Sequence, residues 1–210
     1  MKREKIKKEN FSPLLPEHLF TNKTQDIENQ KDKYSQTIEN GLNFFYYWIE
    51  ENLSLEKQTL IKQEIDQFSQ SYDIPSIHAE MRIPKSILEN FYRAGKEALT
   101  QHPQTGLIDL FKFLTYLLPK SYDIWMGLGL SYQKMDQNAQ ALQAFEQAKH
   151  IHPHLFHPYL FQAESHLYLE NFPLCENGCI QAQQLMTGTP DVFFSYANRL
   201  LSQCRKKEVS

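Results

Sequence analysis

The sequence predicts an all-α protein in which a solenoid of helical hairpins follows an N-terminal helical extension. Its composition favours helices, because 210 residues include 25 leucines but only two valines and seven glycines. Apolar residues recur at helical spacing along most of the chain, and one stretch repeats with a period of 34 residues. A chain of this length can bury the core of one domain with an extension.

Composition and charge exclude several classes of protein. Hydrophobic residues make up 41% and charged residues 22%, which excludes wholesale disorder. No apolar run approaches the roughly 18 residues of a membrane span, and the N-terminus has no unbroken apolar signal region, so we expect no membrane insertion. A net charge of −3 lacks the basic footprint of a nucleic-acid binder. Three cysteines are too few for a disulfide framework and predict a reducing, cytoplasmic location.

The N-terminal part of the chain divides into two segments. Residues 1–33 are charged, rich in Asn, Gln and Lys, and without a sustained period, so we expect a mobile N-terminal segment. Residues 34–83 contain two amphipathic stretches, 38–49 and 61–72, with apolar residues at i, i+4, i+7 and i+11. This pattern predicts a helical hairpin that extends the repeats.

The first of these helices has an unusual aromatic run. Phe44, Phe45, Tyr46, Tyr47 and Trp48 are consecutive, so they surround the helix and exceed what one packing face can bury. We expect this run to contact either the repeats and a second subunit, giving a homodimer through the hairpin, or a client protein.

The clearest repeat predicts two helices that face each other. Its first stripe is spaced i, i+3, i+7 and its second i, i+4, i+7, small residues stand where the backbones approach, and a proline ends the second helix. This is the spacing of a tetratricopeptide repeat (TPR). The eight signature positions hold Trp125, Leu128, Gly129, Tyr132, Ala141, Phe145, Ala148 and Pro153. The turn between the two helices is expected at residues 136–138, where Asp136 and Asn138 tolerate its unusual backbone geometry.

The same period predicts two flanking repeats and a cap. Stepping 34 residues back keeps non-polar residues at every signature position and defines a repeat over about 88–121, and stepping forward defines a degenerate repeat over about 156–189. Thr189 and Pro190 then begin a capping helix, which a solenoid needs to cover its last apolar face. The predicted apolar stripe of this helix consists of Phe194, Ala197, Leu201 and Cys204. We therefore predict a TPR domain over 84–205.

The stretch from Ile83 to about Met186 resembles the TPR-containing type III secretion chaperones of class II, which guard translocator proteins. The blocks that carry the resemblance are Asn90–Gly95, Leu118–Pro119, Gly127–Gln133, and Pro158 with Gln162–Ser165. The resemblance implies a cytoplasmic virulence protein of a Gram-negative bacterium. Such a protein binds an extended segment of a secreted partner in the concave face of three repeats.

TPR geometry indicates which side chains of each first helix line that concave groove. We expect them to accept apolar anchors of the client, with charged residues at the edges. The alternative is that the apolar members are only core residues of a leucine-rich helical chain. The predicted groove residues are Tyr92, Lys96, Leu99, Met126, Leu130, Gln133, Lys134, Leu160, Glu164, Leu167 and Tyr168.

Other motifs are weaker. No nucleophile elbow, phosphate-binding glycine loop or metalloprotease motif occurs, so we predict neither catalysis nor a cofactor. The histidines of 150–157 crowd a proline-broken loop, which disfavours a metal site. Cys175 and Cys179 hold signature positions and are expected to be packed thiols.

The alternative function is a TPR scaffold or adaptor that reads a charged peptide terminus through a carboxylate clamp. Its cationic and amide residues are largely absent here.

Overall fold

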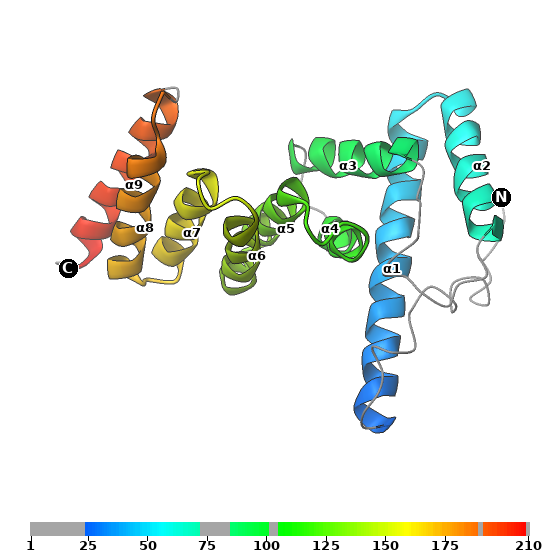
Figure 1. Ribbon diagram of the computed structural model, residues 1–210, viewed down its shortest axis with the longest axis horizontal. Coiled ribbons are helices and arrows are strands. Elements are labelled where there is room, and N and C mark those ends of the chain that lie inside the picture. The colour runs from blue at the N-terminus through cyan, green and yellow to red at the C-terminus, as the bar shows by residue number, and fades with distance from the viewer. Residues whose placement is uncertain (1–23, 72–84, 101–104, 189–190, 209–210) are drawn as a thin grey trace. The chain divides into compact units, whose positions relative to one another are not determined.

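The computed structural model describes residues 24–71, 85–100, 105–188 and 191–208, and the regular structure within these ranges is entirely α-helical (Figure 1). The helices are α1 (Thr24–Asn52), α2 (Leu55–Ser71), α3 (Lys85–Thr100), α4 (Thr105–Leu117), α5 (Tyr122–Lys134), α6 (Asn138–Ile151), α7 (His157–Tyr168), α8 (Phe172–Leu185) and α9 (Asp191–Glu208). The all-α prediction is confirmed. None of these helices is both long enough and apolar enough to cross a membrane.

The chain forms two compact units, residues 1–94 and 95–210, which divide within α3. The predicted limits at residues 34 and 84 remain predictions. Helix α1 begins at Thr24, so the end of the segment that we expected to be mobile is helical. The rest of that segment, residues 1–23, lies outside the described residues.

The first unit is held together by the aromatic run of α1. Phe45 is fully buried, and its ring centroid lies 4.2 Å from that of Phe91 at the start of the first repeat. Trp48 is also buried, and the Arg93 guanidinium lies over its indole at 5.9 Å. The predicted contact with the repeats is therefore present. Tyr47 alone among the five aromatic residues is exposed, at 53%.

The second unit contains successive antiparallel helical hairpins. Helices α5 and α6 form one pair and α7 and α8 the next, α6 packs on α7, and α9 packs on both helices of the last pair (Figure 1). This arrangement confirms the predicted solenoid and its capping helix. One detail was wrong: Phe194 is 46% exposed, while Leu200 joins Ala197, Leu201 and Cys204 in the buried face of α9.

The 34-residue period reappears in the backbone of the turns. Asp136 after α5 and Glu170 after α7 have positive φ values of 56° and 59°. The next amide in each turn, that of Gln137 or Asn171, donates a 2.9 Å hydrogen bond to a carbonyl five residues earlier. This is the C-terminal capping pattern that satisfies the last carbonyls of a helix. A polar side chain at the left-handed position, as we expected for Asp136, tolerates this geometry.

Close packing of the hairpins depends on small residues opposite two phenylalanine rings. A Cβ atom on Gly95 of α3 would lie 2.8 Å from Cζ of Phe111, and one on Gly127 of α5 would overlap the same ring. A Cβ atom on Gly129 would likewise overlap the ring of Phe145. Both rings are buried, so neither can move aside at low cost.

We predict that Gly127→Ala lowers the free energy of unfolding by about 1–3 kcal/mol, because overpacking outweighs the gain in helix propensity of about 1 kcal/mol. Adding Phe111→Leu should recover at least half of that cost, since the new methyl group then meets a smaller side chain. Denaturant unfolding of the single and double variants measures this coupling.

Gly129→Ala is the matched control, because its added methyl group meets Phe145 instead. It should also destabilise the protein, but its cost should simply add to that of Phe111→Leu. Equal rescue of both glycine variants would contradict the pairing of Gly127 with Phe111.

Candidate functional site

The structure separates the predicted groove residues by exposure. Lys96, Lys134 and Tyr168 are exposed, and Tyr168 reaches 65%. Tyr92, Leu99, Leu130, Gln133 and Glu164 are half-buried, and Met126, Leu160 and Leu167 are buried. Tyr92 belongs to the first unit and the others to the second, so its membership of the groove stays a prediction.

The buried members are core residues. Leu160 is 0% exposed and, with Leu167, belongs to the cluster that α7 forms with α8 and α9. Met126 packs with Ala141 and Phe145 of its own hairpin. At these three positions the packing alternative holds, because a neighbouring helix covers the side chain. Among the predicted residues of α5 and α7, those that a ligand can reach are therefore Leu130, Gln133, Lys134, Glu164 and Tyr168.

A polar network joins α5 to α7 on this face. The side-chain amide of Gln133 donates to the carbonyl oxygen of Phe161 at 3.0 Å and to the hydroxyl of Ser165 at 2.9 Å. It also lies 3.5 Å from a carboxylate oxygen of Glu164. Gln133 therefore fixes neighbouring repeats in register, in addition to lining the predicted groove.

The network continues to α9 through Tyr196. The Tyr196 hydroxyl donates a hydrogen bond to the Glu164 carboxylate, so this carboxylate bridges three helices. Burial and the negative Glu164 raise the pKa of Tyr196 well above its usual range. Sequence analysis missed Tyr196, although a 34-residue step from Gln162 reaches it.

A second network holds α6 against α7. The Gln162 amide donates to the Glu146 carboxylate at 2.9 Å, and the Lys149 ammonium lies 2.5 Å from the same carboxylate oxygen. Burial opposes ionisation of Glu146, but the hydrogen bonds from Lys149 and Gln162 outweigh it and lower the pKa. Polar contacts thus accompany apolar packing on both sides of α7.

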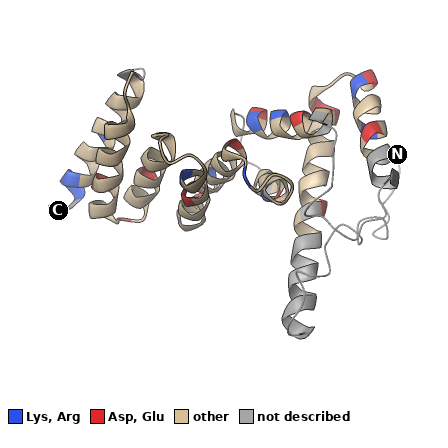
Figure 2. Ribbon diagram, in the orientation of Figure 1, with Lys and Arg blue, Asp and Glu red and all other residues tan. Residues whose placement is uncertain are grey.

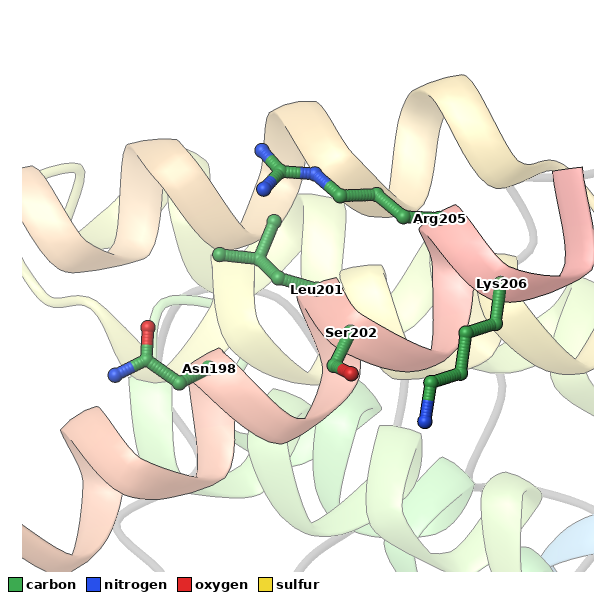
Figure 3. A pocket seen from close by; sticks show the side chains of 5 residues that line it. All are labelled: Asn198, Leu201, Ser202, Arg205 and Lys206. Atoms are coloured by element: carbon green, nitrogen blue, oxygen red, sulfur yellow. The ribbon is translucent and has the colours of Figure 1, made fainter. Parts of the chain in front are cut away.

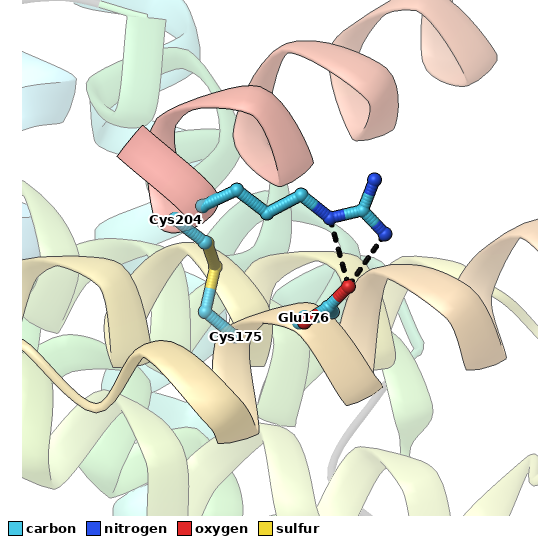
Figure 4. Close-up of a disulfide and its surroundings, with 4 residues drawn as sticks. Cys175, Glu176 and Cys204 are labelled. Carbon is cyan, nitrogen blue, oxygen red and sulfur yellow. Dashed lines mark hydrogen bonds and ion pairs between the residues drawn. A yellow bond between two sulfur atoms is a disulfide. The ribbon is translucent and has the colours of Figure 1, made fainter. Parts of the chain in front are cut away.

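The cysteines differ from the prediction, and the disulfide that two of them form removes their number as an argument for a reducing compartment. Cys175 is buried at its signature position, but its sulfur is bonded to that of Cys204 in a disulfide that joins α8 to α9 (Figure 4). Helical periodicity does not predict this contact, because Cys175 and Cys204 are 29 residues apart and meet only when α9 packs against α8. Cys179 is a buried free thiol, as expected, and burial raises its pKa to about 11.

The histidine loop shows no metal-binding geometry. Within the described parts of the chain, no three His, Cys, Asp or Glu side chains are arranged to hold an ion. His157 instead stacks on Phe156 with ring centroids 3.9 Å apart, and it lies 5.4 Å from Phe193 of α9. Burial lowers the pKa of His157, which favours the neutral ring in this aromatic contact.

The same helical arrangement occurs in solved structures. The Yersinia enterocolitica type III secretion chaperone SycD, in complex with a peptide of the translocator YopD, aligns with a TM-score of 0.55 and 20% identity over 61% of this chain and 97% of SycD. PcrH, in complex with the chaperone binding region of PopD, aligns with a TM-score of 0.57 and 21% identity. That alignment covers 60% of this chain and 97% of PcrH. This chain has the fold of the translocator chaperones.

A structure of the CopN–Scc3 complex extends the likeness. The alignment covers 78% of this chain and 98% of the matched one, at 18% identity and a TM-score of 0.53. No protein-family model and no curated protein sequence matches the chain. The similarity therefore lies in the fold.

We predict that Tyr196→Phe lowers the free energy of unfolding by about 1 kcal/mol at neutral pH, because the half-buried Glu164 carboxylate loses a donor. The pH dependence should also change. A tyrosine whose pKa is raised by folding stabilises the protein below its unfolded pKa of about 10, and this contribution is lost as the pH rises further.

The wild-type protein should therefore lose stability above about pH 10, and Tyr196→Phe should lose less. Denaturant unfolding at several pH values measures the difference. Tyr47→Phe is the control, because its exposed side chain lies in the other unit and loss of its hydroxyl should leave both quantities unchanged. An identical alkaline slope in wild type and Tyr196→Phe would contradict the role of this hydroxyl.

Proposed function

We propose that this protein is a cytoplasmic type III secretion chaperone that binds an extended apolar segment of a secreted translocator or effector. The observation that carries the proposal is the shared fold with SycD and PcrH, each described in complex with a segment of a translocator. The family blocks in the sequence support it independently, as does the accessible face of α5 and α7.

The client segment would contact the accessible residues of that face. Leu130 and Tyr168 are the apolar and aromatic anchors, while Lys134 and Glu164 lie beside them on the same helices. Leu99 and Lys96 extend the surface onto α3. Each buried anchor contributes about 1.5–3 kcal/mol, so a few of them dominate affinity. The charged residues mainly set association rate and selectivity.

The alternative is an adaptor that reads a peptide carboxylate through a TPR clamp. Two positions where such a clamp needs polar side chains are used for packing here. Gly127 leaves room for the Phe111 ring, and Phe161 stacks on Phe145 with centroids 5.8 Å apart. These contacts favour an apolar client. We propose no catalytic activity, since the sequence contains no catalytic motif.

The groove is tested by quantitative affinity purification of the tagged full-length protein from its native cell, followed by mass spectrometry. Leu130→Ser combined with Tyr168→Ser should reduce the recovered client at least tenfold, because each anchor lost weakens binding by 1.4 kcal/mol or more. Circular dichroism should stay nearly unchanged, since neither side chain is fully buried.

The matched control is Leu174→Ser combined with Ile180→Ser, which removes two exposed apolar side chains of α8. This control should retain its client. A folded groove variant that retains its client would place binding elsewhere. A recovered partner whose binding is lost when its C-terminal carboxylate is amidated would favour the adaptor.

We also propose that the N-terminal hairpin forms a homodimer. Tyr47 and Leu60 are more than half exposed in the first unit, at 53% and 58%, although both are large apolar residues. A structure of the similar protein SycD is described as an alternative dimer. Self-association would cover these side chains.

Light scattering should give twice the chain mass of 24.8 kDa for the wild type and the monomer mass for Tyr47→Ser combined with Leu60→Ser. The α8 control variant should remain dimeric. A monomeric wild-type protein at high micromolar concentration would contradict this proposal.

A further inference from the structure

A shallow pocket of about 590 Å³ lies along α9, away from the residues proposed to bind the client. Asn198, Leu201, Ser202, Arg205 and Lys206 line it, and Figure 3 shows their side chains along one length of the helix. Their spacing of i, i+3, i+4, i+7 and i+8 places them on one stripe. Leu201, nearly buried, supplies an apolar floor, and the other four side chains are exposed.

The polar side chains of this pocket offer mainly hydrogen-bond donors. The Asn198 side-chain oxygen accepts a 2.8 Å hydrogen bond from the Gln183 amide, which turns the Asn198 amino group toward other partners. Nε and Nη2 of Arg205 both bond one carboxylate oxygen of Glu176, at 2.9 and 2.5 Å, so Nη1 takes no part in this ion pair (Figure 4). The Ser202 hydroxyl adds a further donor, and the Lys206 ammonium adds a positive charge.

The local charge of α9 also favours an anionic ligand. From residue 192 to residue 207 the chain has four basic residues and no acidic one, although its net charge is −3. Three of the four, Arg205, Lys206 and Lys207, lie in the last turn of α9, which is the blue stretch at the C-terminal end in Figure 2. The Glu176 ion pair also holds the Arg205 side chain in place. A donor-rich, cationic surface selects a ligand that carries carboxylates.

We propose that this face of α9 binds an acidic segment of an extended polypeptide. The pocket runs from Asn198 to Lys206, eight residues or roughly 12 Å along the helix. An extended peptide covers that length with three or four residues, at about 3.3 Å each. Carboxylates at alternate positions lie on one face of an extended peptide, so they would meet the donors together, and their methylene groups would cover Leu201. This site does not depend on the proposed groove.

The basic residues at the end of α9 also have a purely structural role. Basic residues in the last turn of any helix stabilise its negative pole, whether or not a ligand binds. Lys206 and Lys207 contribute equally to that effect, but only Lys206 lines the pocket. The two lysines therefore form a matched pair of mutation sites.

The test is a titration of the ¹⁵N-labelled full-length protein at low ionic strength, followed through backbone amide shifts. The probe is a capped glutamate–leucine–glutamate–leucine–glutamate peptide, and its glutamine counterpart is the neutral control. The acidic probe should give saturable shifts at Asn198, Ser202 and Lys206 and bind at least tenfold more tightly than the neutral one. Lys206→Gln should weaken it at least fivefold, Ser202→Ala at least twofold, and Lys207→Gln less than twofold.

Several outcomes would overturn the proposal. Equal binding of the acidic and neutral peptides would show that charge has no role in binding. Equal losses of affinity in the two lysine variants would show that the peptide responds only to the general positive charge at the end of α9. Inorganic phosphate or a ten-residue oligothymidylate that shifts the same amides with equal or higher affinity would identify a general anion or nucleic-acid surface instead. None of these outcomes bears on client binding at Leu130 and Tyr168.

Discussion

The fit of phenylalanine rings against helix faces that lack side chains is the contact on which the solenoid depends. Phe111 fills the space beside Gly95 and Gly127, and Phe145 fills the space beside Gly129. Each ring is large enough to support two backbones and needs the absence of a Cβ atom opposite it. The distance between the helices of a hairpin follows from this fit, and the surface of α5 and α7 follows from that distance.

Polar contacts then set the register between hairpins. Gln133 joins α5 to α7, and Glu164 receives hydrogen bonds from both α5 and α9. Partly buried polar groups without partners are costly, so the helices have one favoured register in which these groups are satisfied. Gln133 and Glu164, which are proposed for the client groove, therefore also stabilise the packing of the helices. Substitutions there test stability and binding together, which makes Leu130 and Tyr168 cleaner probes of the groove.

The last helix does more than close the solenoid. Its inner face completes the apolar cluster around Leu160, and its disulfide through Cys204 ties it to α8. Its outer face is rich in cations. A cap with a polar outer face is what a solenoid requires for solubility. The arrangement of donors around Leu201 goes beyond that requirement and gives the end of the solenoid a binding surface of its own.

The sequence by itself determined the helices, the repeat and the turns, because these depend on local spacing. The 34-residue period placed Trp125, Gly129 and Phe145 in facing stripes, and Asp136 in a turn that needs a positive φ. Tertiary structure alone decided which groove positions remain open. Met126 and Leu160 occupy the same position of successive repeats and are both covered by neighbouring helices, whereas Leu130, one turn after Met126, stays half-buried. Helical periodicity assigns a residue to a face of its helix, but the neighbours that bury that face, bond Cys175 to Cys204 or bring Tyr196 to Glu164 come from distant parts of the chain.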